Sequence, residues 1–242
     1  MNITLSELDK ARFGITTAKV FINAQDNIEN IIEWCELEEV VMLIARCSTD
    51  DIRLVQRVES AGFFLTDTLV YYRKKNIFKT ENILPNGYEW RLATQNDAEV
   101  VGQLAVKTFA GYSGHYHADP RLNRTDADLV YSSWAENSCK DNIIADAVLL
   151  ITWEDEIAGF ATLRKIESYM FEGVLFGVSP KHQGKSLYNA LMLLSQNWAF
   201  ERGFKQMTVS TQITNLAVQK VWCRQGFEPL KSHYTLHKWF SK

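Results

Sequence analysis

The residues best suited to bind a charged ligand lie in a short polar loop, KHQGK, at positions 181–185. An apolar stretch at 174–178 precedes this loop and predicts a buried strand. The helix that follows has apolar residues at three- and four-residue steps: Leu187, Leu191, Leu194 and Trp198. A helix that begins after such a loop presents unpaired N–H groups and the positive end of its dipole, a cradle for an anion such as pyrophosphate. Alone, the pattern also fits a plain strand–loop–helix, because the glycines of a phosphate-binding turn are sparse.

A second group of reactive side chains lies in the turn-rich segment GYSGHYHADPRLN at 111–123. Two histidines, His115 and His117, alternate there with Tyr112 and Tyr116. A lone histidine is usually structural, and it is the clustering that favours a platform for a base or a sugar. Two arginines follow, Arg121 and Arg124, which could hold a diphosphate in bidentate fashion or simply cover a surface helix. The surface role is favoured for the arginines.

The elements that must position these segments fall into two units. The first has a buried strand at 40–45, a helix at 51–62 and a strand at 65–72. The stretch 74–87 loses this periodicity and contains a proline and a glycine, so we place the domain boundary there. The second unit has predicted strands at 88–92, 147–153, 157–163, 174–178, 207–211 and 228–239, and helices that begin near 94, 126, 187 and 215.

The two units carry a faint internal echo. When Gly62-Phe63 is aligned without gaps on Gly226-Phe227, Asp51 falls on Asn215, Leu54 on Val218 and Val58 on Trp222. Both segments then read strand, helix, Gly-Phe, strand. The first unit is therefore either a partial copy of the second or a convergent unit of the same kind.

Composition excludes several classes of protein. The 242 residues are 46% hydrophobic and 23% charged, as in an ordinary globular chain. The net charge of −3 gives no electrostatic case for nucleic acid or an anionic membrane as partner. The four cysteines have no CxxC spacing, so neither a metal site nor a disulfide framework is expected. No basic leader or membrane-length apolar run is seen, and we expect a cytoplasmic protein. The oligomeric state is left open, with a homodimer as one alternative.

Three features of residues 173–239 together resemble the GNAT N-acetyltransferase superfamily. The sequence VSPKHQGKSLY at 178–188 is similar to that family's strand end and its (Gln/Arg)-x-x-Gly-x-(Gly/Ala) pyrophosphate loop. Asn215 is followed eleven residues later by Gly226 and Phe227, and the order of the predicted elements agrees as well. The VSTQ segment before Asn215 resembles, more closely, the branch of the family that acetylates amino groups of nucleotide-linked deoxysugars. The resemblance covers about residues 88–242.

The resemblance implies an α/β fold with a mixed sheet, of the α+β kind. It implies a GNAT acetyltransferase domain at 88–242, a smaller, truncated GNAT-like domain at 1–80, and acetyl-CoA as acyl donor. The residues it implies for the cofactor are Phe176, Gly177, Val178, Gln183, Gly184, Lys185, Ser186, Leu187, Tyr188, Asn215 and Trp222. The N–H of Val178 would polarise the thioester carbonyl, and Asn215 serves equally well as a plain helix N-cap. The residues expected on the acceptor side are Tyr112, His115, Tyr116, His117 and Arg121.

Three positions depart from the family pattern. Ser186 and Tyr188 stand where the loop usually has small residues, and a tyrosine side chain would crowd the phosphate unless it points away. Trp222 stands where the family often has the tyrosine that protonates the departing thiolate, and indole is no acid of useful pKa. Tyr234 and His115 are the remaining candidates for the catalytic acid. Tyr234 and His237 have opposite side-chain parity on the last predicted strand, so at most one of them faces the cleft.

The sequence therefore predicts an acetyl-CoA-dependent N-acetyltransferase acting on an amino sugar linked to a nucleotide, with dTDP as the expected nucleotide. One alternative keeps the fold and changes the acceptor to a protein N-terminus, a polyamine or an antibiotic. A second is a degenerate module that binds acyl-CoA without turnover, which the three departures favour.

Overall fold

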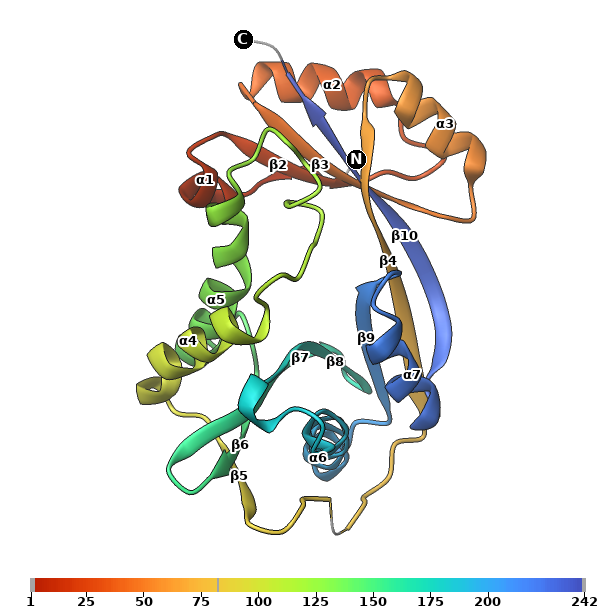
Figure 1. Cartoon of the computed structure of the whole chain (residues 1–242). Helices are drawn as coiled ribbons and strands as arrows, with labels where there is room; N and C mark the ends of the chain where they lie inside the picture. The colour runs from red at the N-terminus through yellow and green to blue at the C-terminus, as the bar shows by residue number, and fades with distance from the viewer. Residues whose placement is uncertain (1–2, 82, 241–242) are drawn as a thin grey trace.

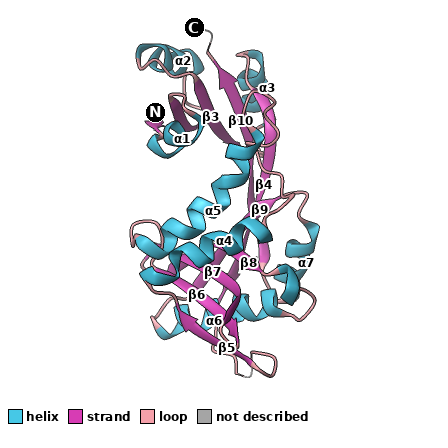
Figure 2. Cartoon of the chain, turned by 60° about the vertical axis from the view of Figure 1, so that its left-hand side comes forward, coloured by secondary structure: helices cyan, strands magenta, loops and turns pink. Residues whose placement is uncertain are grey.

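The computed structural model describes residues 3–81 and 83–240, whose ten strands form one mixed sheet with helices on both faces (Figures 1 and 2). The strand order is β1-β2-β3-β10-β4-β9-β8-β7-β6-β5. The pairs β2–β3 and β8–β9 are parallel, and the other neighbours are antiparallel. The mixed α/β sheet expected from the sequence is confirmed.

The strands are β1 (Ile3–Leu5), β2 (Thr17–Phe21), β3 (Met42–Ser48), β4 (Phe64–Lys75), β5 (Tyr88–Leu92), β6 (Ala147–Trp153), β7 (Glu156–Glu167), β8 (Met170–Val178), β9 (Gln206–Gln212) and β10 (Glu228–Trp239). The helices are α1 (Glu7–Phe13), α2 (Ile28–Leu37), α3 (Ile52–Ser60), α4 (Ala98–Thr108), α5 (Arg124–Lys140), α6 (Leu187–Glu201) and α7 (Leu216–Arg224). Short 3-10 turns, η1 (Gln95–Asp97) and η2 (Pro180–His182), precede α4 and α6. The helix start predicted near residue 94 is confirmed, and Thr94 and Asp97 form a capping box there.

Two long strands from opposite ends of the chain lie side by side in the centre of the sheet. The last strand, β10, lies between β3 and β4, and β4 lies between β10 and β9. In Figure 1 this pair joins the upper part of the molecule to the lower part. The predicted boundary between 1–80 and 88–242 therefore does not divide the sheet, because β10 of the second segment lies between two strands of the first. That the two segments are independent domains stays a prediction.

The internal echo extends to the boundaries of three consecutive elements. The starts of β3, α3 and β4 at 42, 52 and 64 correspond to the starts of β9, α7 and β10 at 206, 216 and 228, and the ends correspond in the same way. Both helices have an N-cap side chain that accepts from the third backbone N–H beyond it, Asp51 from Leu54 and Asn215 from Val218. The two β–α–β segments are therefore equivalent structural units, which we call the first unit (42–75) and the second unit (206–239).

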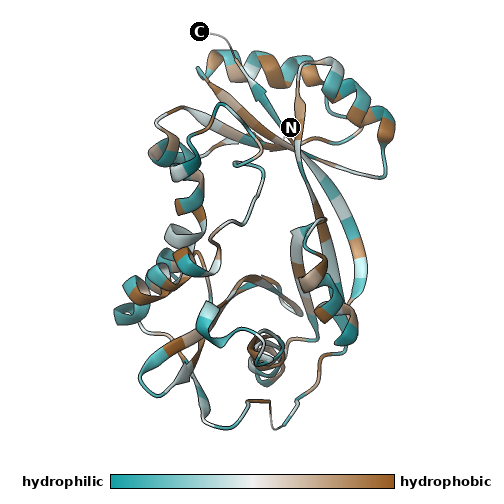
Figure 3. Ribbon diagram, viewed as in Figure 1, coloured by the Kyte–Doolittle hydropathy of each residue, from teal (hydrophilic) through white to brown (hydrophobic). Residues whose placement is uncertain are grey.

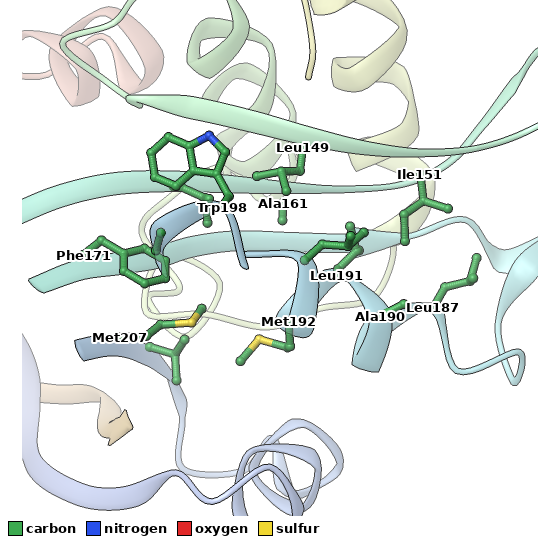
Figure 4. Close-up of a cluster of buried hydrophobic side chains, with 14 of the residues drawn as sticks. Leu149, Ile151, Ala161, Phe171, Leu187, Ala190, Leu191, Met192, Trp198 and Met207 are labelled. Carbon is green, nitrogen blue, oxygen red and sulfur yellow. The ribbon is translucent and has the colours of Figure 1, made fainter. Parts of the chain in front are cut away.

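Helices cover both faces of each half of the sheet. In the N-terminal half, buried residues of α2 and α3 pack on β2, β3 and β10, and these helices alternate hydrophobic and hydrophilic residues in Figure 3. In the C-terminal half, α4 and α5 cover one face. On the other face, α6 sets Leu187, Leu191 and Trp198 among strand residues such as Leu149 and Phe171 (Figure 4). No helix in the described part of the chain is long and apolar enough to cross a membrane.

Candidate active site

The parallel strands β8 and β9 separate part-way along their length. They pair only where Met170–Gly173 lies beside Gln206–Val209. Beyond that point, residues 174–178 of β8 have no strand partner on this edge among the described residues. The N–H of Ser179 donates to the carbonyl of Ala158 in β7, at 2.9 Å, so strand alternation turns the N–H of Val178 toward the open edge. An extended ligand could pair with this edge, as expected for a pantetheine arm.

The polar loop after β8 has the backbone of a glycine-rich turn. Gly184 has a φ of 77° and Ser186 a φ of 62°, so Ser186 adopts the left-handed conformation of the glycine it replaces. No backbone carbonyl in the described ranges accepts a hydrogen bond from the N–H groups of residues 183–186. The first N–H groups of α6 add to this unpaired set. The loop is therefore suited to bind an anion through its backbone N–H groups. The ammonium group of Lys185 lies over the ring of Trp153, 5.8 Å from the ring centre.

A cavity of about 770 Å³ adjoins the separated strands. The loop after α4, the helices α5, α6 and α7, and the strands β8 and β9 all contribute to its wall. It also reaches the N-terminal half, where Lys19 on β2, Arg46 on β3 and Tyr71 on β4 line it. One cavity therefore joins the open strand edge to both halves of the sheet, and its volume is in the range of small-molecule sites.

Tyr188 and Trp222, two of the three residues that differ from the family pattern, contact each other at the cavity wall. The indole Nε1–H of Trp222 donates to the hydroxyl of Tyr188 at 3.0 Å. The ring of Tyr188 contacts that of Phe176, with 5.8 Å between the ring centres. These contacts direct the side chain toward the cavity, so it does not crowd the loop. Burial raises the pKa of Tyr188 more than the Trp222 hydrogen bond lowers it, and the phenol keeps its proton at neutral pH.

A buried chain of hydrogen bonds ends at His115, another cavity residue. His237 Nδ1 lies 2.7 Å from Asp119 Oδ2, and His237 Nε2 lies 2.9 Å from His115 Nδ1. Trp239 Nε1–H also donates to Asp119, at 2.8 Å. Burial raises the pKa of Asp119, but these hydrogen bonds outweigh it and the pKa stays below its usual value.

These hydrogen bonds constrain the protons on the two imidazoles. The ionised Asp119 can only accept, so His237 donates from Nδ1. In the tautomer in which His237 Nε2 carries no proton, it accepts from His115 Nδ1–H, and His115 Nε2 is then an unprotonated nitrogen. Burial lowers the pKa of His115 well below its ordinary value, with help from the positive charges of Arg46 and Lys19 and from His237. At neutral pH His115 is therefore an uncharged base.

The predicted site residues do not all gather at the cavity. Those that line it are Tyr112, His115, Tyr116, Phe176, Tyr188, Asn215 and Trp222. Gln183, Gly184, Lys185 and Ser186 form the adjoining loop, and Val178 ends the open strand. Leu187 and Gly177 serve packing: Leu187 is in the core, and a Cβ on Gly177 would lie 2.4 Å from the Phe160 ring.

Three further predicted residues point elsewhere. His117 bonds to Asp128 at 3.0 Å and is absent from the cavity wall. Arg121 is exposed and lies over the ring of Trp239, at 5.4 Å. Tyr234 packs against the core of the N-terminal half, so of the two strand residues with opposite parity it is His237 that contacts a cavity residue. Asp119 was not singled out from the sequence, where its only signal is its place in the histidine-rich segment. The described residues include no cluster of His, Cys, Asp or Glu arranged to hold a metal ion.

Comparison with known proteins agrees with this geometry. The family model described as "Acetyltransferase (GNAT) family" matches residues 109–227. This range includes the segment 111–123 with His115, the unpaired strand residues 174–178, the polar loop 181–186 and α7. The chain contains a GNAT acetyltransferase domain. It is therefore an enzyme of acetyl transfer, and acetyl-CoA is its acyl donor.

Relatives of this acetyltransferase align over most of its length. It is 23% identical over 232 residues to dTDP-fucosamine acetyltransferase of Escherichia coli O6:H1, which covers 95% of each chain. It is 20% identical over 210 residues to the spore coat polysaccharide biosynthesis protein SpsD of Bacillus subtilis, covering 86% of this chain and 70% of that one.

Solved structures share the fold at low sequence identity. A GCN5-related N-acetyltransferase from Sphaerobacter thermophilus superposes with a TM-score of 0.66 at 12% identity, covering 98% of this chain and 76% of that one. A tandem GNAT protein from the clavulanic acid biosynthesis pathway gives a TM-score of 0.65 at 12% identity, covering 93% and 76%. These likenesses concern the fold alone.

The site residues of the acetyltransferase fit its acyl donor. The open edge at 174–178 offers backbone N–H groups to the amide-containing pantetheine arm, and the left-handed turn at 184–186 leaves N–H groups free for the pyrophosphate. A side chain built on Gly184 would meet no atom within 4 Å, so the space in front of the loop is open. Asn215 bonds through Nδ2 to Thr211 Oγ1, at 3.0 Å, on the same cavity wall.

Proposed function

We propose that this enzyme transfers the acetyl group of acetyl-CoA to the amino group of a nucleotide-linked deoxysugar, with a dTDP-linked amino sugar as the acceptor. The observation that carries the proposal is the single cavity that runs from the open edge of β8 to the N-terminal half of the sheet. Its volume of about 770 Å³ leaves space for an acceptor larger than a simple amine. The relative named as a dTDP-fucosamine acetyltransferase supports the choice, because it aligns over both halves. The cytoplasm is the compartment we expect.

His115 is our candidate for the base that prepares the amine. An amine attacks only when uncharged, and His115 Nε2 is an unprotonated nitrogen on a ring that lines the cavity. On taking up a proton, the imidazole becomes a cation that is connected through His237 to the Asp119 carboxylate. Asp119 and His237 thus act as positioning residues that fix the tautomer. A placed general base contributes about 10²–10⁴-fold to a rate.

Tyr188 is our candidate for the proton donor, in place of Tyr234. Bound acetyl-CoA supplies the acetyl group as a thioester, and its sulfur needs a proton on departure. Tyr188 keeps its phenolic proton and lines the cavity, and the Trp222 N–H fixes its oxygen by donating to it. Trp222, at the position where the family usually has a tyrosine, then serves to orient the hydroxyl of Tyr188 on α6. This reading accounts for the two departures together.

The test is acetyl-CoA-dependent thiol release with a panel of acceptors: a dTDP-linked amino deoxysugar, a peptide with a free N-terminus, a polyamine and an aminoglycoside. We expect turnover with the nucleotide sugar and a product heavier by one acetyl group. Turnover only with another member of the panel would contradict the proposal. With the accepted sugar, His115→Gln should lower kcat about a hundredfold or more and abolish the rise of kcat with pH, while Tyr234→Phe should change kcat little. Tyr188→Phe should lower kcat and leave the affinity for acetyl-CoA nearly unchanged.

A further inference from the structure

Arg46 stands out among the cations that line the cavity. Within the described residues, the cavity wall holds three lysine or arginine side chains: Lys19, Arg46 and Arg164. Lys19 pairs with Asp9 at 2.5 Å, and Arg164 pairs with Glu172 at 2.8 Å. Arg46 has no carboxylate within ion-pair distance in the same described ranges, and its Nε is buried without a hydrogen-bond partner.

The surroundings of Arg46 are short of partners as well. In register across the sheet, Arg46 of β3 lies opposite Thr235 of β10, which lies opposite Asp67 of β4. Thr235 Oγ1 and Asp67 Oδ2 are buried without a hydrogen-bond partner in the described ranges, and burial raises the pKa of Asp67 more than the charge of Arg46 lowers it. Gln212 of β9, whose Oε1 is equally unpartnered, lines the same cavity. Of these atoms only Arg46 Nε and the Thr235 hydroxyl can donate a hydrogen bond. Buried donors without partners are costly, so these two call for a ligand that accepts hydrogen bonds.

The position of Arg46 relative to His115 suits a nucleotide sugar whose amino group lies at the proposed base and whose diphosphate lies at Arg46. His237, which holds His115, lies opposite Ile44 in the β3–β10 register, and Arg46 follows two residues along β3. Two residues of a strand span about 7 Å, so the backbone position of Arg46 and the one opposite His237 are about one sugar ring apart. The positive charge of Arg46 also acts on His115, since it helps to lower the pKa of that imidazole.

We infer that Arg46 binds the diphosphate of the acceptor, so that the first unit of the chain supplies the anion site for a substrate acetylated in the second half. The inference rests on the proposed function. A guanidinium matches phosphate oxygens in bidentate fashion and is fully charged at any working pH. The diphosphate would provide the ion-pair partner at contact distance that Arg46 lacks among the described residues, since the Asp67 carboxylate acts on it only from across β10. Arg121, the diphosphate ligand expected from the sequence, is exposed and stacked on Trp239 outside the cavity wall.

The experiment compares Arg46→Gln with a control, Arg121→Gln, which alters an exposed arginine outside the cavity wall. A charge-assisted hydrogen bond contributes about 1.5–3 kcal/mol, so Arg46→Gln should raise KM for the dTDP-linked acceptor about ten- to hundredfold. KM for acetyl-CoA should stay within about twofold in both variants, and Arg121→Gln should leave the acceptor KM unchanged. Arg46→Lys should give an intermediate KM. A methyl glycoside of the same amino sugar, which has no diphosphate, should be acetylated equally by wild type and Arg46→Gln.

Failure of this inference can be told apart from failure of the proposed function. If wild type acetylates the nucleotide sugar and Arg46→Gln has the wild-type acceptor KM, the diphosphate site lies elsewhere and the function stands. If wild type acetylates no nucleotide sugar, the function fails, and calorimetry with dTDP alone still tests Arg46. A dTDP affinity about tenfold lower in folded Arg46→Gln than in wild type supports the anion site. Equal affinities, or no binding to either protein, overturn it.

Discussion

The first unit (42–75) and the second unit (206–239) have the same element boundaries but different outer neighbours. In the first, β3 pairs with the whole length of the parallel strand β2, from Thr17 to Phe21. In the second, β9 pairs with only the first four residues of the nine-residue strand β8. The first gap is closed by hydrogen bonds, and the second opens into the cavity, where we propose that the cofactor binds. A cofactor groove in this fold therefore depends on the outer strand, because the β–α–β unit itself is the same in both halves.

Corresponding side chains show the same difference. Val58 of α3 is a small core residue, whereas Trp222 at the equivalent position of α7 borders the cavity and binds the Tyr188 hydroxyl. The two units exchange their last strands: β10 of the second unit lies beside β3, and β4 of the first unit lies beside β9. Each exchanged strand contributes to the core of the other half. Leu236 of β10 is buried in the N-terminal core, while its counterpart Tyr72 of β4 packs beside Trp222 in the C-terminal half. The two units thus have the same backbone arrangement, and the last strand of each packs in the core of the other half.

The largest effect we expect comes from breaking this reciprocal packing. Leu236→Ala should lower the free energy of unfolding by about 2–5 kcal/mol, because the side chain is fully buried. Urea denaturation followed by circular dichroism measures this, with Leu230→Ala as control. Leu230 lies on the same strand but is 36% exposed, so its loss should cost less than about 1 kcal/mol. Since β10 belongs to both halves, fluorescence and circular dichroism should report one transition, and two separate transitions would contradict the exchange.

The next prediction tests whether only the second half binds the cofactor. Proline cannot adopt the φ of 62° found at Ser186, and it also removes an N–H donor. Ser186→Pro should weaken acetyl-CoA binding at least about tenfold, a change of 1.4 kcal/mol, whereas Ser186→Gly should keep wild-type affinity. Calorimetry should also give one acetyl-CoA site per chain. Two sites, or an unchanged affinity in a folded Ser186→Pro protein, would contradict the difference between the halves.

A smaller effect should separate the two equivalent N-caps. Asp51 Oδ1 accepts from Leu54 N–H at 3.0 Å, and Asn215 Oδ1 from Val218 N–H at 3.5 Å. Replacing either by alanine should cost about 0.5–2 kcal/mol of stability. Only Asn215 lines the cavity, so only Asn215→Ala should also raise the dissociation constant of acetyl-CoA several-fold. Equal affinities for the two variants would reduce Asn215 to a structural cap.

The last expected effect, comparable in size to that of a helix cap, concerns pH. Burial lowers the pKa of His233 from its ordinary 6.5 to about 4, and Lys231 and Arg46 add to the shift. As the pH falls from 6.5 toward 4, the unfolded chain takes up a proton that the folded chain does not, so stability is lost. The counterpart of His233 in the first unit is Leu69. His233→Leu should therefore lose less stability than wild type between pH 7.5 and 5, as measured by urea midpoints. An equal loss would mean that His233 does not titrate in this way.

The sequence was informative where the signal is local. The anion cradle follows from the order strand, loop, helix, and the Gly-Phe echo located two units whose boundaries the structure then matches. The exchange of β4 and β10 could not be predicted, because each strand's own pattern says which face is buried but not which strand lies beside it. Tyr188 illustrates the same limit. In the sequence it is an oversized residue in a phosphate loop, and only its contact with Trp222, 34 positions away, makes it a proton donor candidate. Arg46 carried no sequence signal at all.

The place of β10 in the sheet also has a consequence for the synthesis of the protein. Because β10 is made after the other described strands, β3 and β4 are complete long before the strand that separates them exists. At about 5–20 residues per second, the ribosome needs roughly 10–30 s to proceed from the first unit to its counterpart. During that time two strand edges are open to pairing with other chains. We therefore expect a nascent or prematurely terminated chain to offer a slot that β10 of another molecule can fill, so that strand-swapped dimers form at high expression.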